Sequence, residues 1–150
     1  MSLHTAENRV PAHAIWLGGL GALPFVGLAG AIPLLSGAPR VFVGHALVAY
    51  ATAILSFLGG VHWGLAIRSE SSRHGEGLWL TLSVIPALAG WAALLFAETP
   101  ALLTLAVAVA VMLGVDIWAS RVSQAPPWYP RLRIPLTCVV VAALLFAAII

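Results

Sequence analysis

Charged residues are scarce in this chain, and lysine is missing altogether. Only 8% of its 150 residues are charged, and all seven basic residues are arginines. A soluble domain carries about 25% charged residues. With 61% hydrophobic residues and a mean hydropathy of +1.03, the chain has too few polar side chains to cover its surface in water. The composition therefore predicts a protein that lies in lipid, and the length allows a single domain over residues 1–150.

Cysteine and recognisable catalytic motifs are also nearly absent. Cys138 is the only cysteine, so the chain alone can form neither a disulfide nor a thiolate metal cluster. The sequence has no H-E-x-x-H, G-x-S-x-G, phosphate-loop or C-x-x-C motif. No basic run or aromatic–basic pattern indicates a nucleic-acid partner. We therefore expect a protein that is not an enzyme, and we predict no metal site.

Five apolar segments are long enough to be considered as membrane-spanning helices. A helix rises about 1.5 Å per residue, so about 20 apolar residues cross the hydrocarbon core. The expected helices cover residues 14–35, 41–67, 77–97, 100–119 and 132–150. In the fourth helix, Thr99 is expected to be the N-cap and Pro100 the first helical residue. The sequence thus predicts an all-α bundle of five transmembrane helices.

The arginines predict how this bundle is oriented in the membrane. Those at the N-terminus and at the connections between helices two and three and between helices four and five are Arg9, Arg68, Arg73, Arg121, Arg131 and Arg133. The opposite side has only Arg40. Because basic residues concentrate on the cytoplasmic side, we expect a cytoplasmic N-terminus and a periplasmic C-terminus. The expected location is the bacterial inner membrane, or the mitochondrial inner membrane in a eukaryote.

The end of the second helix, SFLGGVHWGLAI, is the most informative stretch of the chain. It contains Gly60-x-x-x-Gly64, a spacing of small residues that lets a second helix approach closely in lipid. The first helix is also rich in glycine. We expect Gly27, Gly60 and Gly64 to provide helix-packing surfaces.

His62 and Asp116 are two ionisable residues expected inside the spans on their cytoplasmic half. His62 lies six residues before Arg68 and Asp116 five before Arg121, which places them about 9 Å and 7.5 Å deep. Their helices run in the same direction, so we predict that His62 and Asp116 are partners, because ionisable groups in lipid need one. The adjacent Trp63 and Trp118 would line such a site.

The same residues also admit a purely structural interpretation. Asp116 could pair with Arg121 or Arg133, and His62 could bond a neighbouring backbone carbonyl. The pair would then be a polar clamp between helices. The alternative is a site for a proton, a metal or a small molecule such as a quinone, heme, pigment or lipid.

A proline- and aromatic-rich segment, PPWYPRLR, precedes the fifth helix. Its Trp128, Tyr129, Arg131 and Arg133 are expected to anchor the chain at the level of anionic lipid headgroups. Three further tryptophans near the same boundary, Trp63, Trp79 and Trp118, fit the aromatic belt of a membrane protein.

Two motifs together resemble a known family. SFLGGVHWGLA at the end of helix two and PPWYPRLRIPLT before the last helix resemble domain-of-unknown-function family 3429, small membrane proteins related to transmembrane protein 69. The resemblance covers about residues 14–150. It implies several transmembrane helices in a bacterial or mitochondrial inner membrane, and it implies no reaction and no catalytic residues.

These observations favour one function and leave a second open. We expect a non-enzymatic accessory, assembly or scaffold subunit of a larger respiratory or photosynthetic membrane complex, whose partners are membrane lipids and other membrane-protein subunits. The alternative is a small-molecule-binding or proton-linked membrane protein that uses the His62 and Asp116 region.

Overall fold

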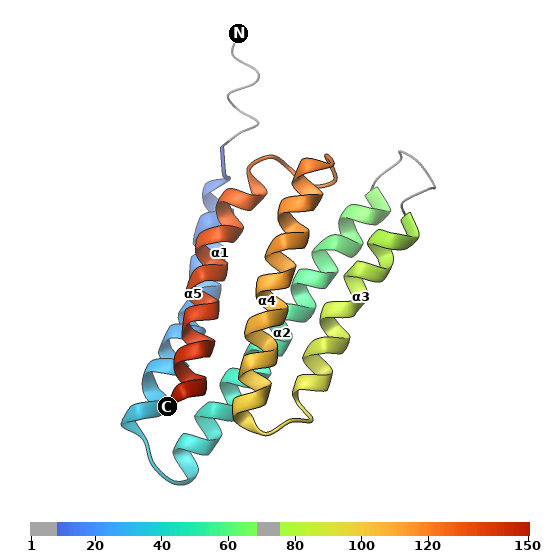
Figure 1. Cartoon of the computed structure of the whole chain (residues 1–150). Coiled ribbons are helices and arrows are strands. Elements are labelled where there is room, and N and C mark those ends of the chain that lie inside the picture. Colours follow the sequence, from blue (N-terminus) through green and yellow to red (C-terminus); the bar gives the residue numbers. More distant parts are fainter. Residues whose placement is uncertain (1–8, 69–75) are drawn as a thin grey trace.

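The computed structural model describes residues 9–68 and 76–150, and within these ranges it contains helices and no strand. The elements are α1 (Ala12–Ala31), the 3₁₀ turn η1 (Ile32–Leu34), α2 (Ala38–Arg68), α3 (Glu76–Ala93), α4 (Glu98–Arg121) and α5 (Tyr129–Ile149). Successive helices run in alternating directions (Figure 1). The ends of α2 and α4 therefore lie at the same end of the bundle as the starts of α1, α3 and α5.

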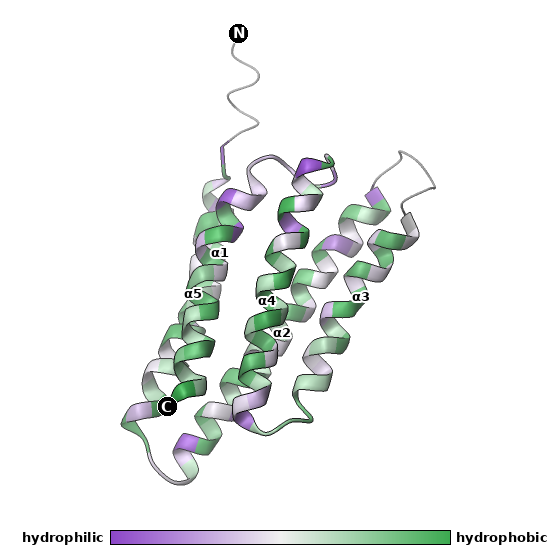
Figure 2. Ribbon diagram, in the orientation of Figure 1, coloured by the Kyte–Doolittle hydropathy of each residue, from purple (hydrophilic) through white to green (hydrophobic). Residues whose placement is uncertain are grey.

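Four of these helices are long and apolar enough to cross a membrane. They are Ala12–Leu34, which includes η1, Ala38–Arg68, Glu98–Arg121 and Tyr129–Ile149. The remaining helix, α3, has a shorter apolar part, Gly77–Ala93. Apolar residues make up most of each helix, and most of the strongly polar residues lie towards the two ends of the bundle (Figure 2). The all-helical fold and the four long spans agree with the composition.

Several helix boundaries differ from those expected. The third helix ends at Ala93 rather than near residue 97, because the chain turns over Leu94 to Phe96 through bonds to carbonyls three residues back. The fourth helix begins at Glu98. Thr99 is therefore inside the helix, and its predicted role as N-cap is wrong.

The reason for the early start of α4 lies in the charge of its first residue. A carboxylate in the first turn interacts favourably with the free N–H groups and the dipole of a helix. The Glu98 oxygens also accept bonds of 3.0 and 3.2 Å from Arg40 Nη1, near the start of α2. Pro100 is tolerated because an N–H in the first turn has no partner within the helix.

Both ends of α2 and the start of α5 move outward, whereas α1 ends early, at Ala31. Helix α2 has 31 residues, so it is about 46 Å long and exceeds the thickness of the hydrocarbon core. Helix α5 begins at Tyr129 with a proline in its first two positions, where proline is favoured. Arg131 and Arg133 are consequently helical residues and not part of a loop.

The hydrophobic core runs along the contacts between the helices. Helix α2 packs most extensively on α3, α4 packs on α5, and α1 contacts both α5 and α2. The fully buried side chains include Leu47, Leu55, Leu102, Leu105 and Leu144. Many large apolar side chains on the opposite helix faces, such as Trp16, Leu17 and Phe57, are exposed. An exposed apolar surface of this kind is what a lipid solvent requires.

The close helix contacts use glycines other than those expected. A Cβ atom on Gly59 would collide with the Ser83 carbonyl oxygen, and one on Gly44 would collide with the Glu98 carboxylate. Around Gly27, Gly60 and Gly64, nothing lies within 4 Å of the position of a Cβ atom. These three glycines are exposed, so they do not bring helices together within the described chain. Packing against another molecule remains a prediction for them.

A comparison of neighbouring glycines tests this assignment. Gly59→Ala should destabilise the bundle by about 1–3 kcal/mol, because the methyl group overpacks the contact between α2 and α3. The matched control Gly60→Ala should be neutral or slightly stabilising, because alanine is the better helix former. Thermal unfolding in detergent, followed by tryptophan fluorescence, measures both. Equal stability of the two variants would contradict the assignment.

Candidate functional site

The described part of the chain contains a buried cluster of three ionisable side chains centred on Asp116. The His62 and Asp116 side chains are completely buried, and Arg133 is 8% exposed. Asp116 Oδ1 lies 2.8 Å from His62 Nε2. The other oxygen, Oδ2, accepts a bond of 2.7 Å from Arg133 Nε. We call these three residues the triad.

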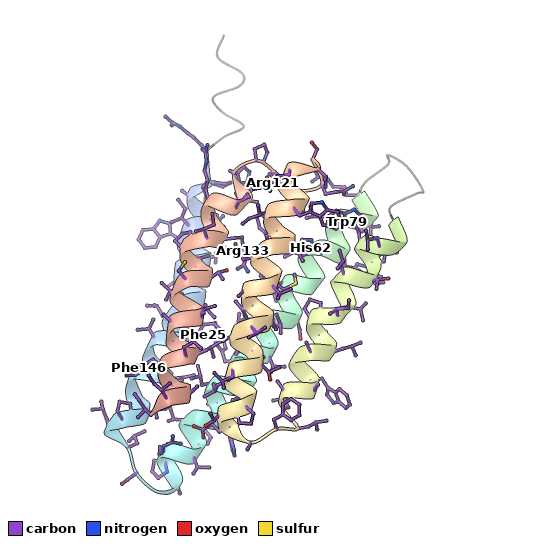
Figure 3. All side chains as sticks on the ribbon, viewed as in Figure 1. Phe25, His62, Trp79, Arg121, Arg133 and Phe146 are labelled. Carbon is purple, nitrogen blue, oxygen red and sulfur yellow. The ribbon has the colours of Figure 1, made fainter. Side chains whose placement is uncertain are left out.

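Three helices bring the triad together at one level. His62 lies six residues before the end of α2, Asp116 five before the end of α4, and Arg133 four after the start of α5. These ends meet because α5 runs opposite to α2 and α4 (Figure 1). The depth along each helix is about 6–9 Å. The labelled side chains of His62 and Arg133 accordingly lie close to one level, below Arg121 (Figure 3).

The contacts combine the two alternatives that the sequence left open for Asp116. The predicted bond between His62 and Asp116 is present, and so is the pairing of Asp116 with Arg133. The arrangement itself is a polar connection between α2, α4 and α5.

The charges and the histidine tautomer follow from the hydrogen bonds. An arginine in a protein is always protonated, so the bond to Arg133 indicates that Asp116 is an ionised carboxylate. Such a carboxylate can only accept hydrogen bonds. His62 must therefore carry a proton on Nε2 and donate it to Asp116. In a neutral imidazole, Nδ1 is then a bare lone pair.

An aromatic ladder leads from this histidine to the surface of the bundle. The His62 and Trp79 rings are nearly parallel, with their centroids 6.1 Å apart. Trp79 in turn stacks on Trp118 at 4.6 Å. Trp79 is only 7% exposed, whereas Trp118 is 40% exposed. Trp79 and Trp118 therefore form one wall of the triad region. Trp79 contacts His62 directly, whereas Trp118 contacts Trp79.

Sequence reasoning misjudged two of these tryptophans. Trp63 follows His62 directly, but one residue turns a helix by about 100°, and Trp63 is 46% exposed on the outer side of α2. It therefore does not line the triad region as predicted. For Trp79, the sequence predicts only a place in the aromatic belt. The signal that could have revealed it is its place in the first turn of α3, which the antiparallel connection sets beside the end of α2.

The predicted headgroup anchor also divides into an inner and an outer part. Arg133 is buried against Asp116, so it does not face the headgroup level. Arg131 is exposed, and the half-buried Trp128 and Tyr129 meet edge to face at 6.0 Å. Arg131 and Arg133 point to different sides because α5 starts early and includes both of them. Two residues along a helix differ in direction by about 200°.

Three buried polar atoms of this region have no hydrogen-bond partner among the described residues. They are His62 Nδ1, Arg133 Nη2 and Thr137 Oγ1. Thr137 lies one turn after Arg133 on α5, and residues at this spacing are neighbours on a helix surface. Within residues 9–68 and 76–150, no three His, Cys, Asp or Glu side chains form a group suited to hold a metal ion.

Comparison with known proteins places the chain in a family. The model of the family described as "Protein of unknown function (DUF3429)" matches residues 10–149. The chain belongs to this family. It is 38% identical over 144 residues to transmembrane protein 69 of Xenopus tropicalis, covering 93% of the chain and 54% of the relative. The corresponding mouse protein, from Mus musculus, is 30% identical over 134 residues, covering 86% of the chain and 52% of the relative.

The chain thus spans about half the length of these relatives. No solved structure matches it significantly. The family resemblance predicted from the two sequence motifs is confirmed. Together with the four long apolar helices, it identifies a membrane protein of this family.

Removal of the central carboxylate should strongly destabilise the bundle. Asp116→Leu leaves Arg133 as an unpaired buried charge, which costs about 3–5 kcal/mol. The double variant Asp116→Leu/Arg133→Met removes both charges and should recover most of this loss. Denaturation of the purified variants in mixed micelles measures the difference. A double variant no more stable than Asp116→Leu would show that the pair of charges is not the source of the loss.

Proposed function

We propose that this protein is a non-enzymatic accessory, assembly or scaffold subunit of a larger inner-membrane complex, respiratory or photosynthetic, and that it contacts its partner inside the bilayer. The observation that carries this proposal is the open outer face of α2. We define this face by Phe57, Gly60, Trp63, Gly64 and Ile67, all of which are exposed.

The outer face has the features of a helix-docking surface. Gly60 and Gly64 are four residues apart and have no atom of the described chain near the position of a Cβ atom. In lipid, association of helices depends on close van der Waals packing, which small residues at this spacing allow. The exposed side chains of Phe57 and Ile67 would flank the approaching helix. The bundle itself uses Gly59 instead, so the pair Gly60 and Gly64 is left for another molecule.

An exposed histidine in the same helix supports this proposal. His45 lies seven residues after the start of α2, about 10 Å along the helix, and it is exposed. Ionisable side chains inside membrane helices normally face a protein interior and have a partner. A neighbouring subunit on this side of α2 would supply one.

The proposed topology has five spans, with α3 as the fifth. At about 27 Å, the 18 residues of α3 nearly match the hydrocarbon thickness. They pack on α2 and α4. The end of the bundle that carries Arg121 and Arg131 would face the cytoplasm, because arginines concentrate there. The same end would bind anionic lipid through Trp128, Tyr129 and Arg131.

Cysteine labelling tests this topology. In a Cys138→Ser background, we introduce Ser123→Cys in the connection between α4 and α5 or Ser36→Cys before α2; both positions are exposed. In intact bacterial cells, a membrane-impermeant maleimide should label the Ser36→Cys variant and should label Ser123→Cys only after lysis. The reverse labelling pattern would show that the orientation is opposite to the one proposed. Labelling of both variants in intact cells would place positions 36 and 123 on the same side of the membrane, which excludes an odd number of spans between these two positions.

Bulky substitutions on the outer face test the docking role. The double variant Gly60→Leu/Gly64→Leu should fold and still lose its partner, because two leucine side chains prevent close approach. Gly114→Leu is the matched control, since Gly114 is an exposed glycine of α4 that also has open space around it. The measurement is native electrophoresis and mass spectrometry of the protein purified in mild detergent.

The amount of partner recovered with the double variant should fall at least tenfold, and the amount recovered with Gly114→Leu should not change. A wild-type protein that migrates alone, as a monomer, would overturn the subunit proposal. So would a double variant that retains its partner. Normal thermal unfolding of the double variant confirms that any loss is not due to misfolding.

A second function is favoured by the triad, namely a proton-linked or small-molecule-binding role. Ionisable groups buried in a membrane segment commonly mark such sites, and Arg133 Nη2 and Thr137 Oγ1 have bonding capacity left. A quinone, pigment or lipid would meet these donors. Of the two ring nitrogens of His62, only Nδ1 could coordinate a heme iron, because Nε2 is bonded to Asp116. Absorbance and extraction of the purified protein test for such ligands.

A further inference from the structure

The triad contains one acceptor that nothing in the described chain satisfies. Asp116 carries one negative charge and Arg133 one positive charge, so with a neutral His62 the cluster has no net charge. The donor Nε2–H is used by Asp116. The lone pair of Nδ1 is buried and has no partner. A buried acceptor in this state is unfavourable unless it gains a donor.

The space around this nitrogen limits what the donor can be. The side chain of His62 has no exposed surface, and one side of its ring faces the nearly parallel Trp79 ring. A bulky ligand would have to displace one of these packed groups. A proton needs no volume of its own, and imidazole is the side chain that most readily exchanges one near neutral pH.

We propose that His62 Nδ1 is the proton-accepting atom of a membrane-embedded proton-binding site formed by the triad. In the binding step, a hydronium ion in the water at the arginine-rich end of the bundle supplies the proton and is left as a water molecule. The Nδ1 lone pair takes this proton, while Nε2–H stays bonded to Asp116. The imidazole becomes an imidazolium, and the charge of the triad changes from zero to plus one. This inference deepens the second function proposed above and does not depend on the docking role of the outer face.

Each element packed around His62 contributes to the balance of this step. On α4, the Asp116 carboxylate stabilises the imidazolium by its negative charge at 2.8 Å. On α3, the face of Trp79 stabilises a cation. On α5, the Arg133 charge opposes proton uptake, and the Tyr129 hydroxyl is a further titratable group. On α1, the only titratable side chain is His13, which is exposed in the first turn.

The two other unpartnered groups extend the site towards α5. Arg133 Nη2 and Thr137 Oγ1 are buried donors one turn apart on α5, and neither has a partner among the described residues. Ordered water commonly satisfies such groups in protein interiors. Water at these positions would solvate the added positive charge. All three triad residues lie only about 6–9 Å from their helix ends, which is a short distance for a proton to cross.

Nitrogen NMR of the histidine ring tests the proposal directly. The full chain is labelled with ¹⁵N-histidine, and the four histidines outside the triad are replaced: His4→Gln, His13→Gln, His45→Gln and His74→Gln. Only His62 then contributes ring signals. At high pH, we expect a protonated Nε2 and a bare Nδ1. As the pH falls from 8 to 5, Nδ1 should move reversibly to the chemical shift of a protonated nitrogen while Nε2 stays protonated.

Two results would overturn the proposal. One is the opposite tautomer at high pH, with the proton on Nδ1. The other is an Nδ1 shift that does not change between pH 8 and pH 5. If the single-histidine protein does not fold, the wild type is compared with His62→Gln, and the ring signals lost in the variant are followed instead. Partner recovery by native electrophoresis is measured separately, so failure of the proton site is distinguishable from failure of the subunit proposal.

Discussion

The constraint on which the interior of this protein depends is the burial of one carboxylate. Asp116 has no exposed surface, and removing an ion from water costs several kcal/mol after relaxation. The structure offsets this cost with two short hydrogen bonds from two other helices. Because each donor must lie within about 3 Å of one oxygen, the ends of α2, α4 and α5 are held in a single relative position. The hydrophobic contacts further along these helices are non-directional, so they fix the relative positions of the helices less strictly than these hydrogen bonds do.

The second half of α2 has one side that faces the interior of the bundle and one side that faces outward. Gly59, His62 and Ala66 face the interior, where they contact α3 and the triad region. Gly60, Trp63 and Gly64 occupy the other side of the same two turns. This division follows from the helical repeat of about 3.6 residues, which separates adjacent residues by about 100°. A short sequence therefore combines the buried polar site with an outer face that is free to meet another helix.

The contrast between the two ends of the bundle fits this view. At one end, Arg40 and Glu98 form a partly exposed pair close to Gly44. Exposed ion pairs contribute little, about 0–1 kcal/mol. At the other end, the charges of Asp116 and Arg133 are buried. Removing them from water costs more free energy than it does for the exposed pair, and their hydrogen bonds are stronger in this environment. The proton site and the helix-docking face that we propose both lie near this end.

The sequence by itself determined the class of protein, the number of helices and the depth of the two inner ionisable residues. Composition decides whether water or lipid is the solvent, and position along a helix decides depth, so both are local properties. It also led to the bond between His62 and Asp116, since two parallel helices with single polar residues at equal depth leave few other partners. Only the tertiary structure decided that Arg133 joins them, that Trp79 rather than Trp63 covers the histidine, and that Gly59 rather than Gly60 packs. Those outcomes depend on how each helix is rotated about its axis. With apolar residues on all sides of every helix, the sequence carries almost no signal for that rotation, and it is set only when the helices pack.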